Sequence, residues 1–127
     1  MEIRAIARNV RMSAQKVREV VRQIQGLDAL AAKAVLAVVP RKSARLVAKT
    51  LDSAIANAVN NNNLKAETLL VKEAVVGQAT PIKRWVTRAR GGGSGILKRS
   101  CHISVTLVEK KVDAEKQKPE SKKTKAN

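Results

Sequence analysis

The sequence predicts an α+β fold of one domain, with three helices between strand-like segments and one long antiparallel β-hairpin. Three observations lead to this prediction. Apolar residues recur with helical spacing between Ser13 and Asn63. The period changes to 2 in the runs on either side of this helical region. Between Ala74 and Val108 lie 35 residues without an acidic side chain, and they include the glycine-rich run 91–95.

The first predicted element is a short strand over residues 2–11, in which arginines stand among aliphatic residues. Its side chains alternate between two faces, as strand geometry requires. One face carries Arg4, Ile6, Arg8 and Val10, and the other carries Ile3, Ala5 and Ala7.

The first helix is expected to begin after Ser13, because a serine hydroxyl can accept a hydrogen bond from a free backbone N–H of the first turn. Apolar residues then recur at i, i+3, i+4 and i+7 and predict one buried stripe. The stripe consists of Val17, Val20, Val21 and Ile24. Gly26 is placed to end the helix in a left-handed conformation.

Two further helices follow. Asp28 is expected to cap the second helix and Pro40 to end it. We expect the buried side of this helix to consist of Leu30, Ala31, Ala34, Val35 and Val38. The third helix begins near Lys42 or Ser43 and ends in the asparagine run 60–63. Its apolar stripe consists of Ala44, Val47, Ala48, Leu51, Ile55 and Ala58.

A long antiparallel hairpin over about residues 78–100 is predicted by two strand-like runs that flank the acid-free stretch. One run is Leu69–Val76, and in the other Ile103, Val105 and Leu107 alternate with polar residues. We expect the turn near Gly91–Gly95. Because an isolated two-stranded ribbon is marginal in water, the hairpin is expected to be mobile until it binds a partner.

The composition changes again at the end of the chain. Residues 109–127 include seven lysines, four acidic residues and a single aliphatic residue larger than alanine, Val112. Such a segment cannot bury enough apolar surface to fold. We therefore expect a domain over residues 1–108 and a disordered, lysine-rich tail over residues 109–127.

The net charge of +16 indicates a polyanionic partner. Residues 1–108 contain 19 basic and 6 acidic side chains, which leaves +13 on the predicted domain. The single cysteine cannot form an internal disulfide, which fits a reducing cytoplasm. Because the chain has no apolar run near 18 residues and its N-terminus lacks the apolar core of a signal peptide, we expect a cytoplasmic protein without a membrane span.

The sequence offers no enzyme site. Cys101 and His102 are the only cysteine and histidine, and adjacent strand residues point to opposite faces, so they form neither a catalytic pair nor a zinc site. The run 91–95 lacks the Gly-Lys-Ser/Thr ending of a phosphate-binding loop. We expect no enzyme, no cofactor, no metal and no small-molecule substrate.

Basic residues instead fall in three groups, which we predict to contact nucleic-acid phosphates. The first group lies around the first strand and helix and contains Arg4, Arg8, Arg11, Lys16 and Arg18. The second lies at the start of the third helix and contains Arg41, Lys42, Arg45 and Lys49. The third lies in the acid-free stretch and contains Lys83, Arg84, Arg88, Arg90, Lys98 and Arg99. The alternative for any single member is a solvated surface position.

Two other side chains have two interpretations each. His102 could contact ribose or phosphate, or it could be a surface histidine whose hydrogen bonds are satisfied within the protein. Trp85 could stack on a base, or it could pack at the base of the hairpin. Since the chain has no other aromatic residue, recognition of the backbone of folded RNA fits better than binding of single strands through stacking.

The chain resembles a known family, the universal large-subunit ribosomal protein L22 in its bacterial form. Five separated blocks carry the resemblance, in the same order and spacing across about residues 3–108. They are Val10–Arg18, Leu51–Ala58, Val71–Ala74, Pro81–Arg84 with Arg88–Gly91, and Lys98–Ile103.

The resemblance implies three helices packed on a small antiparallel sheet, with one long protruding β-hairpin. It also implies a body at the surface of the large ribosomal subunit, where it binds ribosomal RNA, aids assembly and has other large-subunit proteins as neighbours. The hairpin would run inward through the RNA, and its tip would line the tunnel of the nascent polypeptide. By this resemblance the tip consists of Ala89, Arg90, Gly91, Gly92, Gly93, Ser94 and Gly95.

The chain departs from the family pattern at the tip, where Gly92 and its neighbours replace a further arginine, and at Leu97, where a basic residue is common. We therefore expect the flanks of the hairpin to supply most of its grip on RNA. The rival interpretation is an architectural DNA-binding protein with a basic β-arm. That class usually carries an apolar wedge near the tip, whereas Pro81 lies well back from it.

Overall fold

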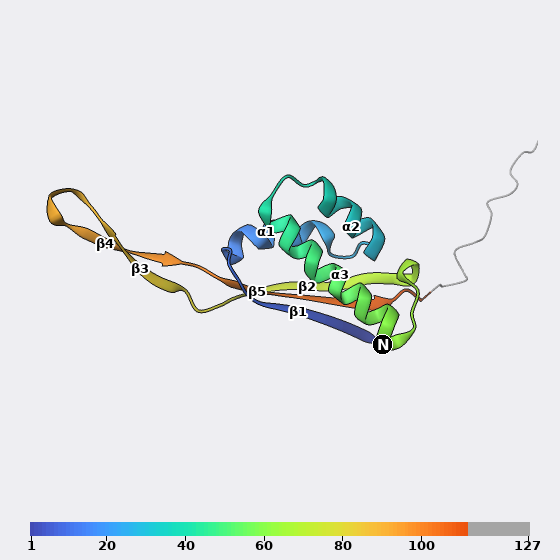
Figure 1. The fold of residues 1–127 in the computed structure, drawn as a ribbon. Coiled ribbons are helices and arrows are strands. Elements are labelled where there is room, and N and C mark those ends of the chain that lie inside the picture. Colours follow the sequence, from blue (N-terminus) through green and yellow to red (C-terminus); the bar gives the residue numbers. More distant parts are fainter. Residues whose placement is uncertain (112–127) are drawn as a thin grey trace, which may run out of the picture.

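The computed structural model describes residues 1–111 and confirms the α+β class. Figure 1 shows a body of three helices and a sheet from which a hairpin projects. The elements, in chain order, are β1 (Glu2–Val10), α1 (Ala14–Ile24), α2 (Ala29–Val38), α3 (Lys42–Asn62), the short 3-10 helix η1 (Ala66–Thr68), β2 (Leu69–Gln78), β3 (Ile82–Thr87), the tip turn η2 (Ala89–Gly91), β4 (Gly93–Lys98) and β5 (Cys101–Glu109).

The strands form two separate antiparallel sheets. In the body the order is β1-β5-β2, so that β5 is the central strand, and β3 and β4 pair only with each other. All three helices lie on one side of the body sheet, with α3 running across it (Figure 1). The other side of the sheet is therefore open.

The core lies between the sheet and the helices and consists of aliphatic side chains and alanine, with Cys101 among them. The predicted stripe of α1 is buried, and so is the inner face of β5, which carries Ile103, Val105 and Leu107. Along α3 the small residues Ala44, Ala54 and Ala58 are fully buried. Small side chains let a helix approach its neighbours closely, so the core closes without a single aromatic ring.

The predicted buried side of α2 is wrong. The helix buries Ala29, Ala32 and Leu36, while Leu30 is 48% exposed and Val38 is 81% exposed. Lys33 is its only residue that is not apolar. A helix that is apolar all round gives no periodic contrast, so the sequence cannot say which face turns inward.

The predicted helix ends are correct in position but not in every contact. Ser13 and Asp28 stand at the N-cap positions of α1 and α2, yet neither side chain makes a capping hydrogen bond. Asp28 instead forms an ion pair with Lys110 at 3.5 Å. Gly26 has the expected left-handed φ of +79°, but α1 ends at Ile24 with the extended Gln25 as its C-cap, and the N–H of Gly26 donates to the carbonyl of Val71. Asn63 closes α3 with φ +53°.

The hairpin turn lies closer to the N-terminus than predicted. The last strand pair is Thr87 with Gly93. The N–H of Arg88 donates to the carbonyl of Gly92 at 2.8 Å, and Arg90 stands at the apex with φ +58°. Of the glycines in the run 91–95, Gly91 alone has a left-handed backbone, and Gly92 completes the turn, so only Gly93 and Gly95 belong to the strand.

The boundary of the predicted tail also moves. Glu109 is the last residue of β5, and the N–H of Lys110 donates to the carbonyl of Thr68 at 2.6 Å. The start of the predicted tail therefore belongs to the body. Residues 112–127, on which the rest of that prediction falls, lie outside the described residues. Within residues 1–111 no helix has the length and apolar character needed to cross a membrane.

Candidate nucleic-acid interface

The hairpin joins the body through two short segments, residues 79–81 and 99–100, which we call the neck. The N–H of Ala79 donates to the carbonyl of Ser100 at 3.1 Å and links the two segments. From the body, Nη1 of Arg11 donates to the carbonyl of Arg99 at 2.6 Å. The neck is thus tied to the loop that connects β1 to α1.

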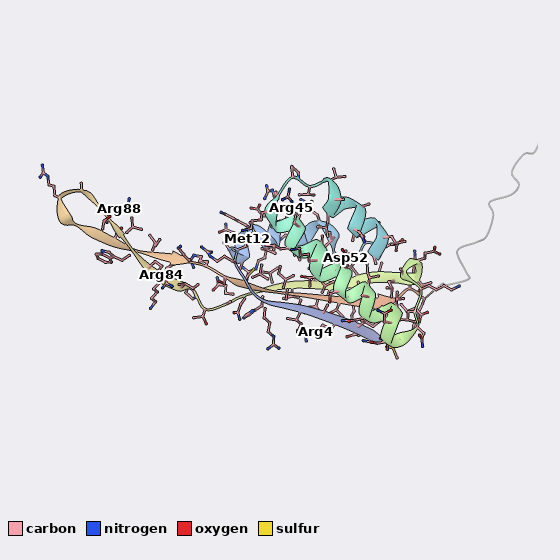
Figure 2. The ribbon with its side chains drawn as sticks, in the orientation of Figure 1. Arg4, Met12, Arg45, Asp52, Arg84 and Arg88 are labelled. Atoms are coloured by element: carbon pink, nitrogen blue, oxygen red, sulfur yellow. The ribbon has the colours of Figure 1, made fainter. Side chains whose placement is uncertain are left out.

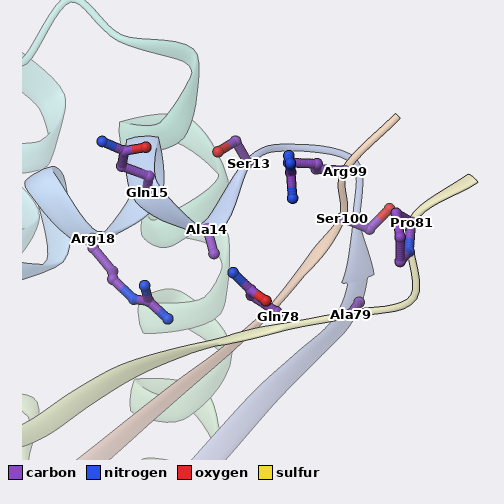
Figure 3. Close-up of a pocket in the computed structure, with 9 residues that line it drawn as sticks. All are labelled: Ser13, Ala14, Gln15, Arg18, Gln78, Ala79, Pro81, Arg99 and Ser100. Carbon is purple, nitrogen blue, oxygen red and sulfur yellow. The ribbon is translucent and has the colours of Figure 1, made fainter. Parts of the chain in front are cut away.

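A polar pocket of about 410 Å³ lies against the neck, between the start of α1 and the end of β2 (Figure 3). Arg18 reaches across it from α1, and its Nη2 donates to the carbonyl of Val76 at 3.2 Å. Arg99 borders the pocket from the neck. The other lining residues are Ser13, Ala14, Gln15, Gln78, Ala79, Pro81 and Ser100.

A second pocket, of about 450 Å³, shares Ser13 and Arg99 with the first. It brings Arg11, Lys16 and Lys42 together with Arg99, although Lys42 comes from a different predicted group. Five predicted site residues therefore lie at the neck: Arg11, Lys16, Arg18, Lys42 and Arg99. We call them the neck cations.

The N-terminus of α1 lies between these two pockets. Its first intrahelical bond runs from the N–H of Val17 to the carbonyl of Ser13 at 3.3 Å. The N–H groups of the three residues in between have no partner within the helix. Since Ser13 does not cap them, they add a partial positive charge beside the neck cations.

The hairpin carries its cations on both faces, because strand side chains alternate. The register places Arg84 and Lys98 on one face. There Nε of Arg88 donates to the hydroxyl of Ser94 at 3.2 Å. Lys83 lies on the other face, and Arg90 is exposed at the apex. Figure 2 shows Arg84 and Arg88 spaced along the hairpin, far from the helices.

Trp85 lies in the outer half of the hairpin, so its interpretation as a packing residue at the base of the hairpin is wrong. It is 68% exposed. Its indole covers Gly93, where a Cβ would be 2.4 Å from the ring atoms Cε2 and Nε1. Gly93 thus leaves room for the ring.

The outer face of the body sheet carries Arg4 and His102, apart from the neck. Figure 2 shows Arg4 on the side away from the helices. Its Nε donates to the hydroxyl of Ser104 at 2.9 Å. Nδ1 of His102 accepts a bond from the N–H of Asn9 at 3.0 Å, at a bulge in β1 where Asn9 has φ +54°. The histidine therefore supports this bulge through one ring nitrogen.

The remaining predicted body cations are spread out. Arg8, Arg45 and Lys49 are exposed, and Arg41 forms an ion pair with Glu19. The other ion pairs in residues 1–111 join Lys33 to Asp52, Lys72 to Glu2 and Lys110 to Asp28. None of the four involves a neck cation or a hairpin cation. Within residues 1–111, the positive charge of neck and hairpin is thus not neutralised by ion pairs.

In the described part of the chain, shifted pKa values occur at one exposed ion pair and at one buried thiol. The hydrogen bond and charge of Lys72 lower the pKa of Glu2, and the pKa of Lys72 is raised by the same contact. Burial raises the pKa of the Cys101 thiol, which favours its unreactive neutral form. No group of three or more metal-ligating side chains occurs within residues 1–111.

Sequence reasoning missed two features of this site. One is the meeting of Lys42 with Arg11 and Lys16, which depends on packing between distant segments. The other is the packing of the Trp85 indole over Gly93. A correct hairpin register would have revealed the second, because it sets Trp85 diagonally across from a residue without a side chain.

Comparison with known proteins covers the same region. The family model described as "Ribosomal protein L22p/L17e" matches residues 5–108. The chain is 49% identical over 109 residues to the large ribosomal subunit protein uL22 of Opitutus terrae, which covers 86% of this chain and 96% of that protein. It is 50% identical over 110 residues to that of Methylacidiphilum infernorum, with 87% and 96% covered. Identity to that of Akkermansia muciniphila is 43% over 109 residues, with 86% and 97% covered.

Proposed function

The chain belongs to the ribosomal protein L22p/L17e family, and from this premise we propose that it binds large-subunit ribosomal RNA through its neck and hairpin. It is a protein of the large ribosomal subunit, in a family of structural proteins and not of enzymes. We further infer that it aids subunit assembly, in the cytoplasm and beside other large-subunit proteins.

The observation that carries this proposal is the uncompensated charge of neck and hairpin. No acidic residue occurs between Ala74 and Val108, and the four ion pairs of residues 1–111 all lie in the body. Like charges held close together oppose folding of the free protein. RNA phosphates offset this repulsion, and the counterions they release favour binding.

At the neck, the chemistry fits a phosphodiester backbone. Arginine guanidinium groups donate two parallel hydrogen bonds to one phosphate, and Lys16 and Lys42 act as point charges. The free N–H groups at the start of α1 add donors of the kind that bind phosphate. We propose that an RNA strand passes along both neck pockets, whose shared residues are Ser13 and Arg99.

On the hairpin, Lys83, Arg84, Arg88 and Lys98 contact RNA along the flanks. Arg90 and its neighbours in the run 89–95 border the tunnel of the nascent polypeptide. The turn itself comprises Arg88–Gly92, so Gly93, Ser94 and Gly95 approach the tunnel only as the first residues of β4. Further RNA contacts come from the half-buried His102 and from the exposed body residues Arg4, Arg8, Arg41, Arg45 and Lys49.

Sedimentation tests this function against the rival one. We expect the tagged protein to sediment with large subunits at moderate salt and to leave the nucleoid fraction empty. A basic β-arm that clasps DNA would give the opposite distribution. A protein that stays off large subunits and follows nucleoid DNA would overturn the proposal.

A further inference from the structure

The hairpin face around Trp85 has features that binding of phosphates does not use. Trp85 is the only aromatic residue of the chain, and the aliphatic core closes without it. It is 68% exposed on a strand that pairs only with β4. Leu97, on the same face, is 49% exposed. A large ring gains little by facing water, so this surface is suited to a partner.

Beside the indole the backbone is bare. Gly95 is the residue directly across from Trp85, and the indole itself leans over Gly93. A Cβ on Gly95 would meet only the carbonyl oxygen of Arg84, at 4.0 Å. The surface over Gly95 is thus open, with the indole on the tip side and Leu97 on the body side.

We propose that a nucleobase of large-subunit RNA stacks on the indole of Trp85, above the bare backbone of Gly95, and that Lys83 contacts the phosphate of that nucleotide. This inference rests on the proposed function and names the contact that one hairpin face makes. Every base has a π-face, so a stack of this kind holds an unpaired nucleotide whatever its sequence.

The two faces of the hairpin then make different kinds of contact with RNA. Arg84, Lys98 and Arg88 lie on the face opposite Trp85 and suit phosphates alone. The Trp85 face combines a ring, an open floor and one cation, Lys83. The absence of acidic residues over 35 positions favours a nucleic acid over a polypeptide of mixed charge as the occupant.

The sole tryptophan gives the experiment a clean signal. The full chain is titrated with protein-free large-subunit RNA at about 0.1 M salt, and binding is measured independently by filter retention. We expect binding to quench the tryptophan emission and to shield it from acrylamide, because a stacked base contacts the ring directly.

Three substitutions at this position separate stacking from bulk. W85F keeps a ring and is expected to bind within about threefold of the native chain. W85L keeps apolar volume without a π-face, and W85A removes both, so each is expected to bind roughly tenfold more weakly. I82A is the matched control, because it removes an exposed apolar side chain from the opposite face of the same hairpin, and we expect it to bind as the native chain does.

The outcomes distinguish this inference from the proposed function. RNA binding with unchanged emission, or equal affinities for W85F and W85L, overturns the stack and leaves the proposed function intact. Absence of RNA binding by filter retention overturns both. A photoreactive residue at position 85 that cross-links in translating ribosomes to the nascent chain, and not to RNA, assigns this face to the polypeptide and also overturns the stack.

Discussion

Nη1 of Arg11 donates a hydrogen bond of 2.6 Å to the carbonyl oxygen of Arg99. The two residues lie on opposite sides of the junction between body and hairpin. Arg11 follows β1, and Arg99 stands between β4 and β5. The bond therefore limits how far the hairpin can swing about the neck, while the Arg11 guanidinium remains exposed to a partner.

Arg11→Ala is expected to loosen the neck without unfolding the body. A charge-assisted hydrogen bond at an exposed site contributes on the order of 1 kcal/mol, so the amide of Ala79 should exchange roughly fivefold faster. Hydrogen exchange read by NMR measures this, with the amides of β5 as an internal reference. Arg8→Ala removes the same charge from the same segment and should leave Ala79 unchanged. Equal acceleration of exchange at Ala79 in both variants would show that the stability of the neck depends on charge alone and not on this hydrogen bond.

Gly93→Ala is expected to displace the Trp85 indole. The new Cβ would be 2.4 Å from the ring, and such overpacking costs about 1–3 kcal/mol. Acrylamide quenching of the tryptophan should rise in the free protein. Gly95→Ala is the matched control, since its Cβ has no neighbour nearer than 4.0 Å. In a Trp85→Ala background, Gly93→Ala should no longer accelerate amide exchange in the hairpin. If the acceleration is undiminished in that background, the contact between Gly93 and the indole is refuted.

The sequence predicts those parts of this fold where local patterns are unambiguous. The stripe Val17 to Ile24 stands out because charged residues and glutamines fill most of the rest of α1, so its period is plain. α2 offers no such contrast, so the face that its sequence favours differs from the face that the structure buries. In the hairpin, five consecutive small residues fit either a turn or a strand. The position of Trp85 directly across from Gly95 is what assigns Gly93 to Gly95 to the strand.

The same limit applies to the candidate site: local properties can be predicted from the sequence, and contacts between distant segments cannot. The sequence identifies which residues are basic and where acidic residues are absent, and these properties do not depend on folding. It cannot bring Lys42 to Arg11, because 30 intervening residues must first pack. Nor does it reveal that Arg41 is paired with Glu19 while the neck cations form no ion pair within residues 1–111.

Replacing Lys83, Arg84, Arg88 and Arg90 by alanine should leave the body folded and impair incorporation into large subunits. None of these residues touches the core, so far-UV circular dichroism of the body should persist. Each lost phosphate contact should reduce the slope of log affinity against log salt by about 1. A variant without Arg22, Lys33, Lys65 and Lys72 loses the same charge outside the proposed interface. If both variants incorporate equally well, the hairpin cations are not the RNA contacts.

The hairpin should be mobile in the free protein. Its strands pair only with each other, and an isolated two-stranded ribbon is marginal in water. Amides in residues 88–97 should exchange within seconds in the isolated chain and become protected in assembled subunits. Strong protection of these amides in the isolated chain would contradict the expectation.

Cys101 should report on unfolding of the body. Its side chain is fully buried, and burial raises the pKa of the thiol. A thiol whose folded pKa is raised stabilises the fold below the unfolded value, and that contribution is lost as pH rises through the folded value. At pH 8 a thiol reagent should label the native chain at least about tenfold more slowly than the chain in urea. The free energy of unfolding should fall above about pH 9, and Cys101→Ala should lack that decline.

The order of strands in the body sheet determines when the protein can fold during its own synthesis. β5 is the central strand, and β1 and β2 each pair with it and not with each other. The strand that both neighbours need is therefore translated last. A growing chain can form α1 and α3 early, but it has no ladder for β1 until residues 101–109 emerge. Truncation before Cys101 removes the middle of the sheet, so incomplete chains cannot hold the neck in place and are left open to degradation.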